Sequence, residues 1–255
     1  MKKKTVIMNF SGIYEEETFY QGQEVCWLDC KDIVGVNGYC SDDAQEEIRK
    51  RMQDYDYRGI HFLDSGNYHY LSKFWLEKIE KPYSLVVFDH HTDMQESAFF
   101  GMLSCGSWIK EVLEEHPYIK EVCVVGPPKA AIEQCEPNLA SRVVFLTQEE
   151  LEAGILEKWQ EFLENEKELP VYLSIDKDVL CLEDARTNWD QGEMKLEDME
   201  EMIKQVFQKR NVLGIDVCGE NPQDTAKMPS KEDLRINNET NNRLYEYFYT
   251  EKGFV

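Results

Sequence analysis

Acidic and imidazole side chains follow several apolar stretches of this 255-residue chain, at the points where those stretches end. Six of them are candidate metal ligands: His69, Asp89, His91, Asp93, Asp176 and Asp178. Carboxylates that are buried together repel one another and take up protons unless a cation compensates them. Four carboxylates and two imidazoles are enough for two divalent ions if some carboxylates bridge. This oxygen-dominated donor set, which contains no thiolate, suits Mn²⁺ better than a structural zinc site.

The stretches before these side chains are apolar on consecutive positions, which is typical of strands covered on both faces. We expect such strands at 5–8, 59–63, 85–88, 122–125, 143–146, 171–175 and 212–215. Apolar residues at helical spacing predict helices at 42–55, 70–80, 105–115, 147–165 and 196–209. Alternating strands and helices indicate an α/β fold whose mostly parallel sheet is sandwiched between helices.

The carboxyl ends of parallel strands meet at one edge of a sheet, which is where open α/β sheets bind ligands. A single Asp-x-Asp pair more often caps a helix or forms a turn. Several such clusters after separate strands favour one shared site instead. No internal repeat or linker divides the chain, so we expect a single domain over residues 1–255. The segment from about Ser230 could form a final helix or an oligomer contact.

Charge and cysteine usage restrict the partners. The chain has 28 Lys and Arg against 50 Asp and Glu, a formal net charge of −22. This balance argues against nucleic acid or an anionic membrane as partner and favours metal cations and small molecules. The eight cysteines form no C-x-x-C pair and several lie in apolar runs, as expected for reduced thiols in a cytoplasmic protein. The basic start is followed by no apolar segment long enough for export or a membrane span.

Four features together resemble the arginase/agmatinase family, the ureohydrolases. They are a D-x-H-x-D string at 89–93, an S-x-D-x-D string at 174–178, the upstream His69, and Asp216 followed by Asn-Pro at 221–222. The resemblance implies an arginase-like three-layer α/β/α fold and a dinuclear manganese centre that hydrolyses C–N bonds of guanidino compounds. It also implies a possible homo-oligomer.

Roles for the individual ligands follow from the same resemblance. One ion would be held by His69, Asp89, Asp93 and Asp176. The other would be held by His91, Asp89, Asp176 and Asp178, so that Asp89 and Asp176 bridge. Two such ions acidify a bridging water to hydroxide. Asp178 would be both a ligand and the group that passes a proton to the leaving amine.

The sequence departs from the family pattern near the substrate. Gly219 stands where ureohydrolases have a glutamate that pairs with the guanidinium, and the acid comes one residue later, at Glu220. A one-residue shift reverses the face of a strand, so only a bulge would return Glu220 to the site. The histidine expected in the stretch 104–108 is missing, and His90 replaces a small residue after Asp89. We include Glu220 and His90 with Asp178 as candidate catalytic residues, although strand alternation favours a packing role for His90.

Three alternatives remain open. Asp64-Ser65-Gly66 followed by 89–91 resembles the DHH phosphoesterases, which are also two-metal hydrolases, but residues 1–40 lack their N-terminal Asp-x-Asp segment. An amidohydrolase resembling the deacetylases would use one zinc ion, whereas six donors favour two ions. The loss of the guanidinium acid and of the histidine also allows a metal-stabilised binding module without catalysis.

Overall fold

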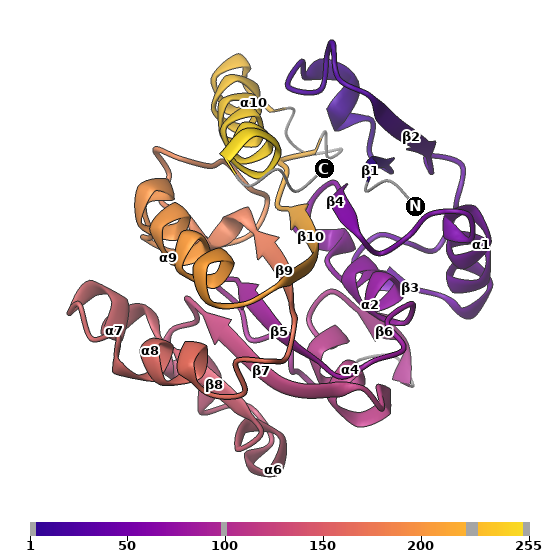
Figure 1. Ribbon diagram of the computed structural model, residues 1–255. Coiled ribbons are helices and arrows are strands. Elements are labelled where there is room, and N and C mark those ends of the chain that lie inside the picture. The colour runs from indigo at the N-terminus through magenta and orange to yellow at the C-terminus, as the bar shows by residue number, and fades with distance from the viewer. Residues whose placement is uncertain (1–3, 98–100, 223–228, 252–255) are drawn as a thin grey trace.

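Eight strands form one parallel sheet through the middle of the protein (Figure 1). The structure is a computed structural model that describes residues 4–97, 101–222 and 229–251. The strands are β1 (Lys4–Asn9), β2 (Val25–Asp29), β4 (Gly59–Phe62), β5 (Tyr83–Phe88), β7 (Ile119–Val125), β8 (Val143–Leu146), β9 (Val171–Asp176) and β10 (Val212–Cys218). Their order is β2-β1-β4-β10-β9-β5-β7-β8. Every strand expected from the apolar runs is present in the sheet.

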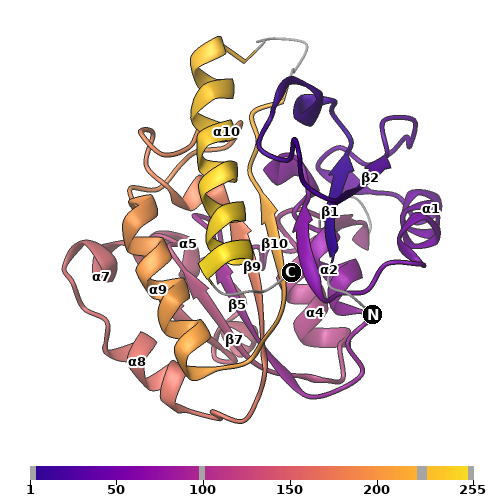
Figure 2. The same cartoon turned by 45° about the horizontal axis from the view of Figure 1, so that its top comes forward.

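Helices cover both faces of this sheet (Figures 1 and 2). One face carries α1 (Asp42–Met52), α2 (Leu71–Leu76), α4 (Trp108–Glu115) and the short α5 (Lys129–Ile132) and α6 (Pro137–Ala140). The other carries α7 (Gln148–Glu152), α8 (Glu157–Glu164), α9 (Leu196–Lys209) and α10 (Lys231–Glu246). The predicted three-layer α/β/α architecture is therefore confirmed.

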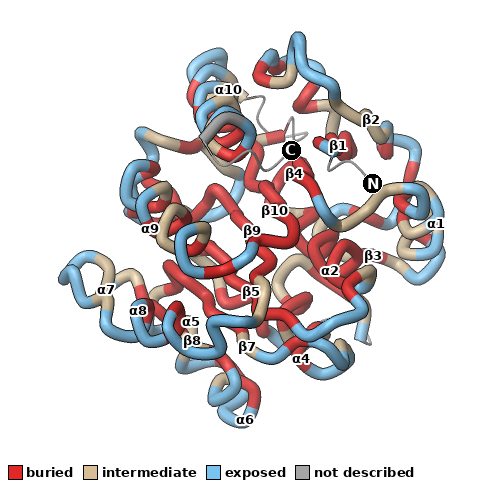
Figure 3. The backbone as a smooth tube through the Cα atoms, in the orientation of Figure 1, coloured by how far each residue is buried: buried red, intermediate tan, exposed pale blue. Residues whose placement is uncertain are grey.

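Strand alternation explains why the strands read as continuous apolar runs. Leu85 and Val87 of β5 join the core beneath α1, α2 and α4, whereas Val86 and Phe88 join the core beneath α8 and α9. Both cores exclude water, and Figure 3 shows the sheet as a buried layer with exposed residues on the outer sides of the helices. A parallel sheet buried on both faces requires apolar residues at odd and even positions alike.

The strand order brings the chemically active segments together. β9 and β10 insert between β4 and β5, although they come more than a hundred positions after β4 in the chain. The register pairs Cys218 with Asp176 and Phe88 with Ile175, so the carboxyl ends of β10, β9 and β5 lie level with one another. The segments that follow these strands must therefore meet at one edge.

Three elements differ from the sequence-based expectation. The sheet gains β2, which is not among the expected strands although it carries a short apolar run at 25–28, and whose residues are only partly buried because it lies at the edge of the sheet. A small antiparallel ribbon of β3 (Tyr39–Cys40) and β6 (Leu103–Ser104) lies outside the sheet. The helix expected at 147–165 is divided into α7 and α8, because Gly154 between them adopts a φ of 69° that a helix cannot accommodate.

The segment after Ser230 forms α10, which begins with a capping box between Ser230 and Asp233. Leu244 and Tyr245 of this helix are buried in the same core as α9. Within the described ranges, no helix combines the length and the apolar character needed to cross a membrane.

Truncation of Leu244 tests the docking of α10. We expect Leu244→Ala to lower the free energy of unfolding by about 2–5 kcal/mol, because the fully buried side chain leaves a cavity. Glu239→Ala, on the exposed side of the same helix, should change it by less than about 0.5 kcal/mol. Chemical denaturation measures both values, and equal effects would show that α10 does not pack as described.

Candidate metal centre

Two groups of histidine and aspartate ligand atoms lie side by side at the carboxyl edge of the sheet. One group contains His69, Asp89 and Asp93, the other contains Asp89, His91 and Asp178, and within each group the ligand atoms lie within 4.8 Å of one another. Asp89 belongs to both groups. The structure thus brings together side chains that follow β4, β5 and β9, as the sequence predicts.

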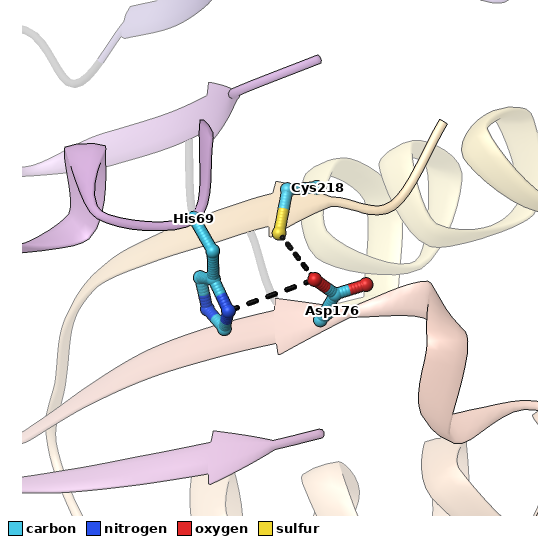
Figure 4. Close-up of side chains that lie close together, drawn as sticks. All are labelled: His69, Asp176 and Cys218. Atoms are coloured by element: carbon cyan, nitrogen blue, oxygen red, sulfur yellow. Dashed lines mark hydrogen bonds and ion pairs between the residues drawn. The ribbon is translucent and has the colours of Figure 1, made fainter. Parts of the chain in front are cut away.

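His69 reaches this edge through the short helical turn Gly66–Tyr68, which it terminates. Its Nδ1 lies 3.0 Å from Asp89 Oδ2 and 3.0 Å from Asp93 Oδ2, and 3.6 Å from Asp176 Oδ2 (Figure 4 shows the approach to Asp176). Its other nitrogen, Nε2, lies 2.9 Å from Ser174 Oγ. A hydrogen on Nε2 leaves the Nδ1 lone pair directed at the carboxylates, which is the orientation of a metal-ligating imidazole.

His91 has the same arrangement. Its Nδ1 lies 2.9 Å from Asp178 Oδ2 and 3.4 Å from Asp89 Oδ1, and its Nε2 lies 3.0 Å from Asp190 Oδ1. A carboxylate that accepts the second imidazole hydrogen fixes the ring and makes the ligating nitrogen more basic. Each histidine therefore presents Nδ1 to the acids and is held by a polar partner on its outer side.

The electrostatics of the cluster are those of acids that lack a compensating cation. Burial raises the pKa of Asp93 to about 7, and the charge of Asp89 adds to this effect. Burial and neighbouring carboxylates also raise the pKa values of Asp176 and Asp178. Burial alone would lower the pKa of His69, but the carboxylates of Asp89 and Asp93 outweigh it and raise that pKa well above its ordinary value.

These residues fit divalent metal ions. His69 Nδ1 and Asp89 Oδ2 are buried without a well-formed hydrogen bond, although such polar atoms are almost always paired. A cation between them would satisfy both atoms and remove the repulsion that raises the aspartate pKa values. The donor chemistry of both groups is mixed carboxylate and imidazole, which suits Mn²⁺.

A small cavity opens onto the acids. Its volume is about 130 Å³, and its lining includes the six predicted ligands together with Gln95, Ser104, Cys105, Trp189 and several backbone positions. Among the described residues that line it there is no lysine or arginine. The cavity therefore offers carboxylates, imidazoles, neutral polar groups and the aromatic residues Tyr39 and Trp189 to a small guest.

Several residues that hold the ligands were not predicted as part of the site. Trp108 donates its indole N–H to Asp93 Oδ2 at 2.6 Å, while the backbone carbonyl of Asp93 accepts from Ile109 at the start of α4. Asp190 holds His91, and Cys218 lies 3.2 Å from Asp176 Oδ2. A fully buried tryptophan usually needs a hydrogen-bond acceptor for its indole N–H, and this requirement is the signal in the sequence that points to a polar partner for Trp108.

Glu220 does not reach the cavity. Its carboxylate is fully buried and contacts Lys177 Nζ, Asn237 Nδ2 and Asn241 Nδ2, on the side of α10. Gly219 before it has a φ of 95°, and a Cβ atom there would lie 2.5 Å from Asp176 Oδ1. The position where the family carries its glutamate is therefore filled by Asp176. The structure gives Glu220 the role of partner to a buried lysine.

His90 and two further acids also lie outside the cluster. The His90 ring packs near Gly192 and edge-on against the His91 ring, with its Nε2 3.9 Å from Asp190 Oδ2, and its backbone N–H donates to Asp178 Oδ1 at 3.0 Å. Asp216 lies 2.8 Å from Nδ1 of the core histidine His61. Asp64, on which the phosphoesterase alternative rests, accepts hydrogen bonds from Ser11 and from the Phe10 backbone and ties β1 to β4.

Solved structures with this architecture include an amidino hydrolase and a formiminoglutamase with Mn²⁺. Proclavaminate amidino hydrolase from Streptomyces clavuligerus aligns with a TM-score of 0.67 over 96% of this chain and 92% of its own, at 14% identity. Formiminoglutamase from Trypanosoma cruzi, solved with Mn²⁺, aligns with a TM-score of 0.62 over 94% and 92%, at 12% identity. At these identities the comparison establishes the arginase-like fold.

Sequence comparison gives the family. The Arginase family model matches residues 15–231. An uncharacterized protein of Thermotoga maritima is 32% identical over 231 residues, which are 90% of this chain and 85% of that protein. The chain belongs to the arginase family, whose members are hydrolases that act on C–N bonds.

Replacement of a shared ligand tests the centre. We expect Asp89→Asn and Asp176→Asn each to remove most bound metal and to abolish the rise in melting temperature that metal gives the native protein, because bound metal stabilises only the folded state. At a free metal concentration a hundred times the Kd, that stabilisation is about 2.7 kcal/mol. Elemental analysis and thermal melts measure both effects. Asp54→Asn, on the surface, is the control, and unchanged metal content in Asp89→Asn would contradict the shared-ligand assignment.

Replacement of Glu220 should reduce stability without affecting metal binding. We expect Glu220→Gln to lower the free energy of unfolding by about 3 kcal/mol, since it leaves the ammonium of Lys177 buried without its carboxylate. The metal content should remain that of the native protein. Glu239→Gln, which weakens an exposed ion pair, should cost less than about 1 kcal/mol. Loss of metal with unchanged stability would instead place the Glu220 carboxylate at the centre.

Proposed function

We propose that the protein is a dinuclear metal hydrolase, with Mn²⁺ as its metal, that cleaves a C–N bond of a small guanidino or amide compound. The observation that supports this proposal is the pair of histidine and aspartate groups that share Asp89 beside a cavity. Membership in the arginase family and the Mn²⁺ of a structural neighbour agree with it. When bound, two such ions supply an activated water as the nucleophile and polarise the group under attack.

Residues around the acids hold the proposed metal ligands in place. Ser174 and Asp190 orient the two imidazoles, and Trp108 holds Asp93. Fixed orientation of this kind lowers the cost of assembling the reacting groups. Trp189 lies at the cavity lining, where its indole N–H donates to Asn67, and can exclude water from one side of a bound substrate.

Asp178 is the residue to which we assign proton transfer. Its carboxylate lines the cavity and lies 2.9 Å from His91 Nδ1, and its position is fixed by the backbone N–H of His90. Burial and the charges of Asp176 and Asp89 raise its pKa well above the usual value. An oriented carboxylate beside the proposed ions can accept a proton and return it. Neither Glu220 nor the His90 ring has a place in this step.

The cavity also restricts the substrate. Its volume of about 130 Å³ is below the range of pockets that hold drug-sized molecules, so the reacting end of the substrate must be small. The described lining contains no lysine or arginine to pair with a substrate carboxylate, and its two imidazoles already face the acids. A substrate carboxylate near the acids would be repelled. The proposed substrate is therefore cationic or neutral, without a carboxylate near the scissile bond.

Metal analysis followed by a substrate panel tests the function. Purified protein should contain two Mn²⁺ per chain after loading and should release urea or ammonia from some member of a panel of guanidines, amidines and amides. We expect agmatine to be turned over with at least about tenfold higher kcat/KM than arginine, a difference of about 1.4 kcal/mol, because arginine carries an α-carboxylate at the other end of the molecule, for which the described lining offers no lysine or arginine.

Two controls complete the test. Asp178→Asn should lower kcat by about 10²–10⁴ on any substrate found. Phosphate esters should not be hydrolysed. Two bound Mn²⁺ per chain with no turnover of any panel member would contradict the hydrolase and favour the metal-stabilised binding module.

A further inference from the structure

The thiol of Cys218 lies inside the candidate metal centre. Cys218 ends β10, pairs in register with Asp176 of β9, and is 1% exposed. Its Sγ lies 3.2 Å from Asp176 Oδ2, and Figure 4 shows the sulfur and the His69 ring approaching that carboxylate from two sides. The sulfur therefore stands beside a carboxylate that we place among the metal ligands.

The same group contains a buried histidine nitrogen that has no well-formed hydrogen bond, although Asp89 Oδ2 and Asp93 Oδ2 each lie 3.0 Å from it. His69 Nδ1, Asp176 and Cys218 Sγ form a third set of ligand atoms within 4.8 Å of one another. His69 is 1% exposed, and its Nδ1 has no well-formed hydrogen bond although it points at this set. A buried lone pair directed at a carboxylate and a thiol requires a hydrogen or a cation between them.

We propose that Cys218 is a direct ligand of the ion held by His69 and Asp176. This inference deepens the proposed function and rests on it. On metal binding the S–H bond breaks, the sulfur forms a bond to the ion, and the proton leaves to solvent. Thiolate ligands select softer ions such as Zn²⁺ and Co²⁺, whereas carboxylate ligands suit Mn²⁺. The ion near Cys218 is thus bound by nitrogen, oxygen and sulfur donors.

The two halves of the centre then differ in metal preference. The group of Asp89, His91 and Asp178 contains oxygen and nitrogen donors only. The group of His69, Asp176 and Cys218 adds sulfur. We expect one position to accept Zn²⁺ or Co²⁺ in preference to Mn²⁺, and the other to remain suited to Mn²⁺.

A second cysteine gives a matched control. Cys181 Sγ lies 3.5 Å from Asp184 Oδ2, so it is also a largely buried thiol beside a carboxylate. Cys181 belongs to none of the three ligand sets found among the described residues. A spectroscopic effect that arises only from a thiol next to an acid would appear with both cysteines, whereas metal ligation would depend on Cys218 alone.

Cobalt substitution tests the proposal directly. The native protein loaded with Co²⁺ should show a thiolate-to-cobalt charge-transfer band in the near ultraviolet. The band should be lost in Cys218→Ser and Cys218→Ala and should persist in Cys181→Ser. In competition with a chelating dye, Cys218→Ser should lose Zn²⁺ affinity by roughly tenfold or more, since even groups that only support a ligand contribute 10–100-fold. Its affinity for Mn²⁺ should change less.

The outcomes separate this inference from the proposed function. Bound Co²⁺ without the band, or a band that persists in a folded Cys218→Ser, would overturn the ligand assignment, and so would failure of the native protein to bind Co²⁺. Circular dichroism establishes that each variant is folded. A cobalt–thiolate band in a protein that turns over no substrate would support Cys218 as a ligand while the hydrolase proposal fails. Turnover of a substrate by a protein that shows no cobalt–thiolate band would support the hydrolase proposal and overturn the assignment of Cys218 as a ligand.

Discussion

Mutual repulsion of buried carboxylates is the constraint on which this structure depends. Asp89, Asp93, Asp176 and Asp178 lie together, each at most 6% exposed, in a protein that already carries a net charge of −22. Such a cluster is costly unless positive charge enters it. Within the described chain, that charge comes only from the imidazoles of His69 and His91. Because the acids attract divalent cations for the same reason that they repel one another, the cost to stability and the capacity for chemistry have one origin.

The topology of the sheet brings these acids together at one edge. Parallel strands must carry apolar residues along their whole length when both faces are covered, so polar residues collect at the strand ends. The insertion of β9 and β10 between β4 and β5 makes one such edge receive the ends of several strands. The core and the site are therefore products of the same pattern. Apolar side chains fill the strands, and their termination defines the edge.

The sequence predicts the strands of the sheet and the acids at their ends because both depend on residues that are close together in the chain. Consecutive apolar residues identify β5 and β9, and the acids follow within a few positions. The half-buried edge strand β2 is absent from the expected set although it carries a short apolar run at 25–28, and the break at Gly154 depends on a backbone conformation that helical periodicity does not reveal. The sequence also does not indicate which side chains from other segments hydrogen-bond to the predicted ligands. The contact of Trp108 with Asp93 and that of Asp190 with His91 depend on how loops pack, not on spacing in the chain.

The orientation of Glu220 is the clearest feature that the sequence alone does not predict. A shift of one residue predicts a change of face, and Gly219 could have reversed it, so the pattern alone left the direction open. The structure resolves this through Lys177, whose buried ammonium attracts the Glu220 carboxylate away from the cavity. The charge of Lys177, in the short helical turn that follows β9, decides the direction. Sequence reasoning that treats each motif separately does not include that interaction.

Lys177 has a consequence for the order in which the protein matures. It lies between Asp176 and Asp178, and its ammonium hydrogen-bonds to Asn241 of α10, which is made 64 residues later. Until that helix has left the ribosome, Lys177 lacks one of its polar partners and the segment that bears both acids is incompletely supported. Completion of the acidic edge is therefore coupled to the docking of α10 against the sheet.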